Sequence, residues 1–327
     1  MPTRREFLGA MMAGSAALSL SQKGLAHLSA HLSSVNSFEW LAAPLIRAQA
    51  GETLITILHT NDTHSQIDPL PANDKQHPGL GGVARRATLI KRIRRENPNS
   101  LLVDAGDVFQ GTPYFNFFHG EVEYRAMSAM GYDVGTLGNH EFDNGVASLA
   151  AALKYANFDL VNANYDMRGT PLENRVKPYV VRDVGGVRVG LFGMGFQLEG
   201  YYPPDRYTGI KFLDRVSVAR DAVRALRERE GCALVVCLSH MGYYEPRKGN
   251  EFGDSQLVAQ VDGIDFIASG HSHIFMEKPV MAKQPSGRET MIFQVGKSGI
   301  YLGRVDFTMR AGRITASAGR LLDLREG

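Results

Sequence analysis

Five short clusters of histidine, aspartate, asparagine and glycine stand out in this sequence, because their side chains bind metals and transfer protons. In an extended segment, residues i and i+2 project to the same side. Asp62 and His64 could therefore hold one ion together, and so could His271 and His273. Imidazole and carboxylate ligands in one site are typical of zinc, manganese and iron. The five clusters are Thr60–His64 (Thr-Asn-Asp-Thr-His), Gly106-Asp107, Gly138–Asp143 (Gly-Asn-His-Glu-Phe-Asp), Ser239-His240 and Gly270–His273 (Gly-His-Ser-His).

An apolar run that predicts a β-strand precedes each cluster. Taken singly, each cluster has an ordinary structural explanation, such as a turn, a helix cap or a chance pair. Five of them, each at the end of a predicted strand, are instead typical of a metal site, because open α/β sheets place their sites at the carboxyl ends of strands. The five predicted strands are 54–58, 101–103, 134–137, 233–238 and 266–268.

The remaining elements predict a mixed α/β fold. Amphipathic or apolar helical patterns cover 82–95, 122–130, 146–155 and 216–229. Further strands are predicted at 160–162, at 179–184 and 187–192 around a Gly-Gly turn, and at 291–295, 302–309 and 313–318. A βαβ start followed by late hairpins predicts strands in two packed sheets with helices outside, in one domain over about residues 52–323.

These motifs resemble those of the calcineurin-like metallophosphoesterases, and the 5′-nucleotidase branch matches best. Beyond Thr60–His64 and Gly138–Asp143, that branch's Gly-Gly-x-Ala-Arg motif is found at Gly81–Arg85, and its Gly-Ile-Asp-x-Ile…Gly-His-Ser-His motif at Gly263–His273. The resemblance covers about residues 53–310. It implies a four-layer α/β/β/α sandwich, in agreement with the pattern of elements.

The resemblance also implies two divalent metal ions, which could be zinc, manganese or iron. Such a pair activates water and stabilises the attacking and leaving oxygens of an in-line displacement, so a phosphate ester would be hydrolysed by a hydroxide that bridges the metals. Asp107 would contact both ions. The first metal would be bound by Asp62, His64, Asp107 and His273, and the second by Asp107, Asn139, His240 and His271.

His140 is expected to act as an acid or charge stabiliser at the leaving group. Asp143 follows three residues later, one helical turn on, and would orient the imidazole of His140. Asn139, His140 and Arg85 are the expected substrate contacts. Arg85 and Arg86 are equally compatible with a phosphate contact and with a position facing solvent.

The neighbouring residues are expected to be structural. Glu141 is predicted to support the loop rather than to react. Phe115, Phe117 and Phe118 are predicted to pack in the core, with a pocket wall as the alternative.

The expected function is phosphoester hydrolysis, 5′-nucleotidase-like, with a nucleotide as the expected small-molecule substrate. Members of this branch usually carry a second, C-terminal domain that holds the nucleoside, and this chain ends at Gly327, so we expect that domain to be absent. The chain could then be the catalytic half of a two-chain nucleotidase, completed by a separately encoded specificity domain. It could also hydrolyse cyclic nucleotides, nucleotide sugars or thiosulfate-type groups. The intact ligand set argues against a silent metal-binding module.

The pattern of residues 1–50 is typical of a signal peptide and leader, and we expect the catalytic domain at 51–327. Thr3–Leu8 forms a twin-arginine pattern, and the uncharged stretch after it has 14 residues, short of the about 20 that span a membrane. Cleavage is expected after Ala26 or Ala50, although the segment could persist as a helix. The mature protein would be periplasmic or secreted by the twin-arginine route, with membrane contact only during export.

Composition excludes other classes. The chain has 327 residues, 44% of them hydrophobic and 21% charged, and a net charge of +2, so neither disorder nor nucleic-acid binding is expected. Cys232 and Cys237 lie five residues apart in one predicted strand, on opposite faces and roughly 16 Å apart, too far for a disulfide.

Overall fold

The computed structural model describes residues 49–244 and 252–326. The predicted twin-arginine pattern and the cleavage site after Ala26 lie outside the described residues. Ala50, the other predicted cleavage site, is exposed in a turn just before the first strand. Within the described ranges, no helix has both the length and the apolarity needed to cross a membrane.

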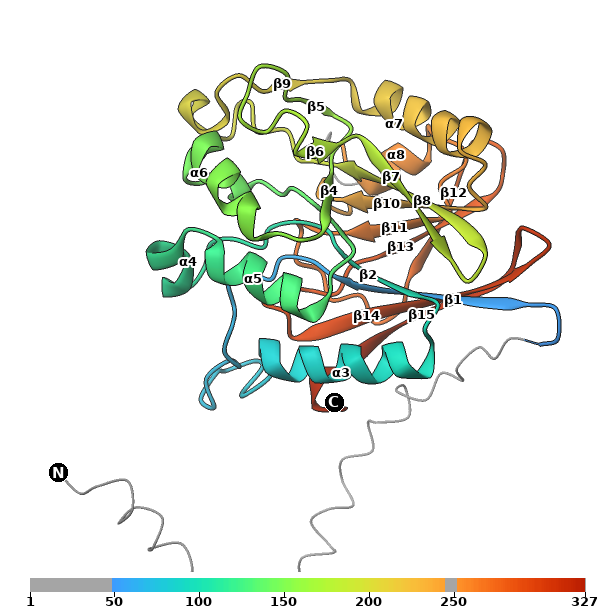
Figure 1. Ribbon diagram of the computed structural model, residues 1–327, viewed down its shortest axis with the longest axis horizontal. Helices are drawn as coiled ribbons and strands as arrows, with labels where there is room; N and C mark the ends of the chain where they lie inside the picture. The colour runs from blue at the N-terminus through green and yellow to red at the C-terminus, as the bar shows by residue number, and fades with distance from the viewer. Residues whose placement is uncertain (1–48, 245–251, 327) are drawn as a thin grey trace, which may run out of the picture. The chain divides into compact units, whose positions relative to one another are not determined.

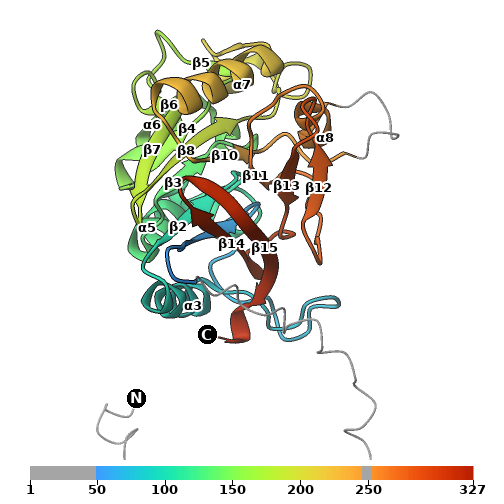
Figure 2. The ribbon, with the colours of Figure 1, turned by 90° about the vertical axis from the view of Figure 1, so that its right-hand side faces the viewer.

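The first sheet has seven strands in the order β15-β14-β1-β2-β3-β4-β6. Strands β1, β2, β3, β4 and β6 are parallel. Beyond β1, strand β14 pairs antiparallel with β1, and β15 pairs antiparallel with β14. Their bounds are β1 Thr53–Thr60, β2 Ser100–Asp104, β3 Val134–Thr136, β4 Asp159–Val161, β6 Val176–Lys177, β14 Tyr301–Arg310 and β15 Arg313–Asp323. Figure 2 shows the long β14–β15 hairpin facing the viewer.

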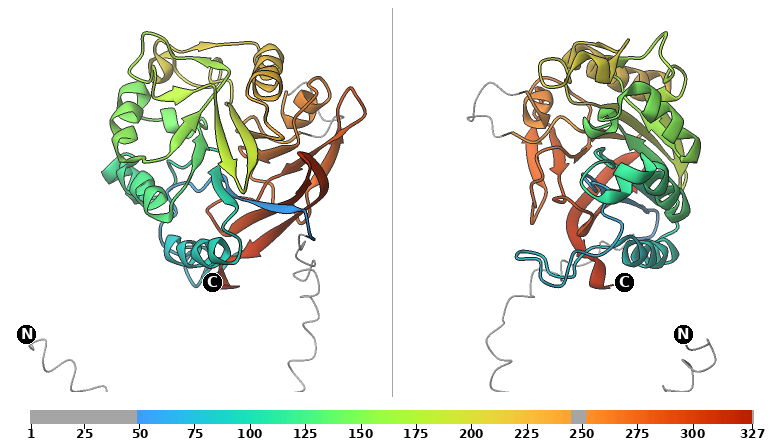
Figure 3. Two further views of the ribbon diagram at one scale, coloured as in Figure 1. Left: turned by 45° about the vertical axis from the view of Figure 1, so that its right-hand side comes forward. Right: turned by 90° about the vertical axis from the view of Figure 1, so that its left-hand side faces the viewer.

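The second sheet has six strands in the order β12-β13-β11-β10-β8-β7. Its inner strands β13, β11, β10 and β8 are parallel, and both edges are antiparallel. The predicted hairpin around the Gly-Gly turn is confirmed as β7–β8, the yellow-green hairpin in Figure 3, left. Gly185 and Gly186 have φ of 57° and 79°, as a tight two-residue hairpin turn requires. Bounds are β7 Tyr179–Val184, β8 Val187–Met194, β10 Leu234–Ser239, β11 Phe266–Ser269, β12 Val280–Lys283 and β13 Glu289–Phe293; β5 (Tyr165–Asp166) and β9 (Lys211–Phe212) pair separately.

The helices cover the outer faces of the two sheets (Figure 1). The predicted helix at 216–229 is α7 followed by a π-helical turn at Ala225–Arg229, and the one at 146–155 is α6 followed by a 3₁₀ turn at Leu153–Tyr155. Bounds are α3 Val83–Glu96, α4 Pro113–Phe118, α5 Glu121–Met130, α6 Gly145–Ala152, α7 Arg215–Arg224 and α8 Asp254–Val258, with further 3₁₀ turns at His140–Phe142, Pro204–Tyr207 and Leu324–Glu326.

Three apolar layers hold these elements together. One lies between the seven-stranded sheet and α3, α5 and α6, one between the sheets, and one between the six-stranded sheet and α7 and α8. Strand alternation explains the layers: in β1, Ile55 and Ile57 face the other sheet while Leu58 faces the helices. The predicted four-layer α/β/β/α sandwich is therefore confirmed.

Two predictions about apolar side chains need correction. Cys232 and Cys237 are both free, but they lie in the same apolar layer rather than on opposite faces. Cys232 precedes β10, so strand alternation does not govern it. Phe115 is buried as predicted, whereas Phe117 and Phe118 are 77% and 48% exposed because the short helix α4 turns only one side to the core.

Candidate metal centre

The carboxyl ends of strands from both sheets meet at one edge and bring the predicted ligands together. Asp62 and His64 follow β1, Asp107 follows β2, and Asn139 follows β3. From the second sheet, His240 follows β10, and His271 and His273 follow β11. They form two groups in which one ligand atom from each residue lies within 4.8 Å of the others: Asp62, His64 and His273, and Asp107, His240 and His271.

The first group has ring nitrogens that face each other. Nε2 of His64 lies 2.9 Å from Nε2 of His273, and both approach Oδ1 of Asp62, at 3.8 and 3.3 Å. Nδ1 of His64 donates to the carbonyl oxygen of Phe109 at 3.3 Å. Because a carbonyl only accepts, a neutral His64 has its lone pair on Nε2, directed into the group.

The second group shows the same arrangement more sharply. Nδ1 of His240 donates to the carbonyl oxygen of Ala105 at 2.7 Å, and Nε2 lies 3.0 Å from Oδ2 of Asp107. Among the described residues, no atom forms a hydrogen bond with that buried Nε2. If the ring of His240 is neutral, the lone pair of its Nε2 faces the carboxylate of Asp107, and the two repel each other. A cation bound between them would remove this repulsion. Metal-binding histidines characteristically donate their other N–H to a backbone carbonyl in this way.

The charges of the centre attract positive charge. Burial would lower the pKa of His240, but the carboxylates of Asp107 and Asp62 raise it to about 10. Burial lowers the pKa of His64 below its usual range and that of His271 to about 4. Without a metal, His240 therefore carries the positive charge itself, whereas the lowered pKa of His64 and His271 keeps their rings neutral, as metal ligands must be. A metal ion would replace the proton of His240 as the positive charge beside Asp107.

The backbone at the centre is held in an uncommon conformation. Five of the seven predicted ligands have positive φ, between 49° and 72°, a left-handed region that non-glycine residues adopt rarely. Such backbone strain clusters at functional sites. Gly138 shows how tight the packing is, because a Cβ there would lie 2.1 Å from Oδ1 of Asp107. The five residues are Asp62, His64, Asp107, His271 and His273.

His140 lies beside the ligands, with its ring oriented by Asp143. Its Nδ1 lies 2.9 Å from Oδ2 of Asp143, and its backbone N–H donates to Oδ1 of Asp107 at 2.8 Å. Burial opposes protonation of this ring, but the hydrogen bond to Asp143 and nearby carboxylates raise the pKa of His140. Asn139 donates to the hydroxyl of Tyr202 at 2.9 Å, and its Oδ1 lies 2.9 Å from Nδ1 of His271.

Three positioning residues were not assigned their roles from the sequence. Glu141, predicted only to be structural, accepts backbone N–H bonds from Asp107, Val108, Phe109 and Gly138. Asn61 donates to Oδ2 of Asp62 at 2.6 Å. Buried Gln294 donates to the carbonyl of Gly270 and accepts the N–H of Ile274, and so holds the loop that carries His271 and His273. A lone glutamine directly after the apolar residues of β13 was the available signal for Gln294.

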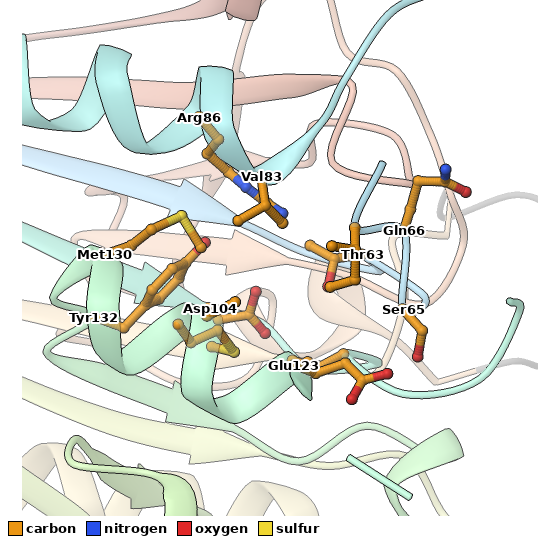
Figure 4. A pocket seen from close by; sticks show the side chains of 13 residues that line it. Thr63, Ser65, Gln66, Val83, Arg86, Asp104, Glu123, Met130 and Tyr132 are labelled. Atoms are coloured by element: carbon orange, nitrogen blue, oxygen red, sulfur yellow. The ribbon is translucent and has the colours of Figure 1, made fainter. Parts of the chain in front are cut away.

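The two predicted arginines differ in their surroundings. Arg85 is exposed and donates to the carbonyl of Gly79 at 2.6 Å. Arg86 is 3% exposed, so it does not face solvent, and its phosphate contact stays a prediction. It lines a cavity of about 10 Å³, space for about one water, with Asp104, Glu123 and Tyr132 (Figure 4). Burial raises the pKa of Asp104 to about 7 even with Arg86 nearby.

Comparison with known proteins agrees with this geometry. The family model of calcineurin-like phosphoesterases matches residues 55–275. The chain belongs to this family. The family relationship extends to its 5′-nucleotidases: the venom 5′-nucleotidase of Gloydius brevicauda is 33% identical over 302 residues, which cover 86% of this chain and 49% of the relative. The 5′-nucleotidase of Bos taurus is 32% identical, over 82% of this chain and 49% of its own length.

A solved structure of the family shares the same fold. The 5′-nucleotidase precursor of Thermus thermophilus superposes with a TM-score of 0.74 at 34% identity, over 83% of this chain and 54% of that one. The chain therefore spans about half the length of the relatives it matches. This family uses a dinuclear divalent metal site, and the orphaned Nε2 of His240, the mixed nitrogen and oxygen donors and the two adjacent groups fit such a site.

Proposed function

We propose that this phosphoesterase hydrolyses phosphate esters at a dinuclear metal centre, with a nucleotide as the substrate. The observation that carries the proposal is the pair of adjacent ligand groups: Nε2 of His64 faces Nε2 of His273 at 2.9 Å in one, and Nε2 of His240 faces the carboxylate of Asp107 at 3.0 Å in the other. The 5′-nucleotidase relatives support a nucleotide as the phosphoester.

Each group would hold one ion. Asp62, His64 and His273 would bind the first, and Asp107, His240, His271 and Asn139 the second. Asp107 lies with the second group, and its expected bridge to the first ion stays a prediction. When bound, two divalent ions supply Lewis acidity and positive charge at the phosphate. Zinc, manganese and iron all suit these donors.

His140 and Asp143 would act on the leaving group. Because Asp143 occupies Nδ1 of His140, the ring is oriented with Nε2 available to a bound ester. A protonated His140 beside Asp143 could stabilise or protonate the departing oxygen, which is general acid chemistry. Asn139, whose amide is fixed between Tyr202 and His271, would contact the substrate.

A panel of phosphate esters, assayed with the chain alone and with manganese or zinc, tests the proposal. It should include nucleoside monophosphates, a cyclic nucleotide, a nucleotide sugar, glycerol phosphate and p-nitrophenyl phosphate. We expect metal-dependent release of phosphate, fastest from nucleoside monophosphates. Absence of hydrolysis of every ester with either metal would refute the proposal. Activity that appears only when a separately encoded specificity domain is added would support the two-chain alternative.

We further propose that residues 1–50 are a leader for twin-arginine export and that 51–327 is the catalytic domain, active in the periplasm or outside the cell. The twin-arginine pattern supports this, as do a venom relative and a relative described as a precursor. Fractionation of cells that express the chain with Arg4→Lys and Arg5→Lys tests the route.

A further inference from the structure

An open cavity of about 710 Å³ lies directly beside the second ligand group, since Asn139 and His271 form part of its wall. Its volume falls within the about 300–1,000 Å³ that small-molecule sites occupy. The proposed chemistry takes place at one end of this cavity, so the part of the substrate that leaves the phosphate has room to lie in the rest. The wall is unusually aromatic: Phe196, Tyr201, Tyr202, Tyr244 and Phe252 all line it.

The aromatic rings continue outward from the ligand group. The ring of Phe196 stacks on His271, with centroids 4.3 Å apart and planes at 29°. Tyr201 packs edge-on against Phe196 at 5.0 Å and 66°, yet 71% of Tyr201 is exposed. A large aromatic side chain left this open beside a site offers its face to a ligand. Aromatic side chains in this situation bind nucleic-acid bases by stacking, whatever the base, since every base has a π face.

Arg215, at the start of α7, adds a cation to the same wall. Its guanidinium lies 4.5 Å above the ring of Phe252 and donates to the carbonyl of Phe252 at 3.4 Å. The side chain is half-buried, yet it forms no ion pair with any carboxylate in the described ranges. A guanidinium that is desolvated and still has free N–H groups is suited to the carbonyl and ring-nitrogen acceptors of a base.

We propose that this cavity binds the leaving group of the substrate and selects one with a planar aromatic ring, as a nucleoside has. Tyr201 stacks on the ring, and Arg215 donates to its acceptor edge. Phe196 links the two sites, because it packs on His271 on one side and on Tyr201 on the other. The inference rests on the proposed phosphoester hydrolysis and specifies the substrate class.

Calorimetric titration of the manganese-loaded protein with adenosine tests the cavity without any turnover. Adenosine should bind, and ribose, which has no ring to stack, should give no measurable heat. Tyr201→Ala and Arg215→Gln should each weaken adenosine binding about tenfold. Phe117→Ala is the matched control, because Phe117 is a similarly exposed aromatic residue, at 77%, on α4 and outside the cavity. It should bind adenosine as the unaltered protein does.

A kinetic measurement complements the titration. The ratio of kcat/KM for AMP to kcat/KM for ribose 5-phosphate should fall about tenfold in Tyr201→Ala and stay unchanged in Phe117→Ala. Absence of adenosine binding, or full affinity in both cavity variants, would overturn the inference while leaving phosphoester hydrolysis intact. If no ester is hydrolysed, the proposed function fails, and the adenosine titration still decides the role of the cavity.

Discussion

His59 and His240 are both completely buried, yet the protein surrounds them differently. His59, in β1, packs between Phe266 and Phe293 with ring centroids 5.6 and 5.3 Å away, and neither of its nitrogens has a hydrogen-bond partner in the described part of the chain. Burial alone lowers the pKa of His59 to about 3. At His240 the same burial is outweighed by the carboxylate of Asp107, and the pKa rises to about 10.

The difference shows that burial of a histidine does not by itself mark a site. At His59, an apolar environment excludes charge, and the ring acts as a packing group between the sheets. At His240, unpaired negative charge is concentrated in a place that water does not reach, so only a proton or a metal ion satisfies it. The strained loops after the strands create the charged surroundings of His240, whereas the interior between the sheets creates the apolar surroundings of His59.

Asp107→Asn should have the largest effect, because it removes the carboxylate that distinguishes the surroundings of His240 from those of His59. We expect kcat/KM for a nucleoside monophosphate to fall about 10²- to 10⁴-fold, since a bound metal contributes several kcal/mol to the transition state. Metal content, measured by mass spectrometry of the dialysed protein, should fall with it. Asp306→Asn is the matched control, because Asp306 is a buried carboxylate paired with Arg304 in β14, remote from the ligand groups.

Asp306→Asn should cost stability and leave the metal content as it is. Full metal content and rate in Asp107→Asn would contradict the assignment of the second ligand group. Equal loss of metal in both variants would mean that general destabilisation, and not a missing ligand, is responsible.

Sequence reasoning located the centre because its information is local. Each predicted ligand follows an apolar strand, and parallel strands necessarily bring their carboxyl ends to one edge. Six of the seven predicted ligands, far apart in the chain, therefore lie in the two groups, and Asn139 lies against His271. The layers were predictable for the same reason, because strand alternation assigns each side chain to one face.

Contacts between neighbouring strands and between layers could not be predicted from the sequence in this way. Gln294 supports the His271 loop only because β13 pairs with β11, and nothing within β13 reveals that. Arg86 shares its helix with the exposed Arg85, and only the packing of α3 on the sheet determines which of the two is buried. Exposed Tyr201 lies in a loop with no repeating pattern, so its place beside Phe196 follows from the fold alone.

Glu141→Ala should have the next largest effect, on stability. Its carboxylate satisfies four backbone N–H groups in the loops around Asp107 and Gly138, and a buried donor left without a partner costs about 1–3 kcal/mol. We expect a loss of about 3 kcal/mol or more in urea unfolding, together with reduced metal content. Glu121→Ala, which removes an exposed pair with Arg125, should change stability by less than about 0.5 kcal/mol. A Glu141→Ala protein as stable as Glu121→Ala would show that water replaces the carboxylate.

Asp143→Asn tests whether the ring of His140 needs charge as well as orientation. The amide can still accept from Nδ1 but does not stabilise an imidazolium, so kcat should fall about tenfold with KM and metal content nearly unchanged. Asp205→Asn, an exposed carboxylate on the neighbouring 3₁₀ turn, serves as the control. A fall in metal content would instead place Asp143 among the groups that hold the ligands, and an unchanged kcat would leave His140 without its proposed partner.

His59→Leu should give the smallest effect, and it tests whether the apolar surroundings of His59 keep its ring uncharged. The unfolded chain binds a proton at His59 with a pKa of about 6.5, whereas the folded state does so only near pH 3. Full stability is therefore present above pH 6.5 and is lost as the pH falls towards 3, by about 1.4 kcal/mol between pH 7.5 and 5.5. His59→Leu should remove that share of the pH dependence, measured by urea unfolding at both values. Phe293→Leu disturbs the same packing without a titrating group, so its difference from the unaltered protein should be equal at the two pH values. If His59→Leu also shifted stability equally at both, the ring would be protonated or hydrated in the folded state, and the contrast with His240 would not rest on charge.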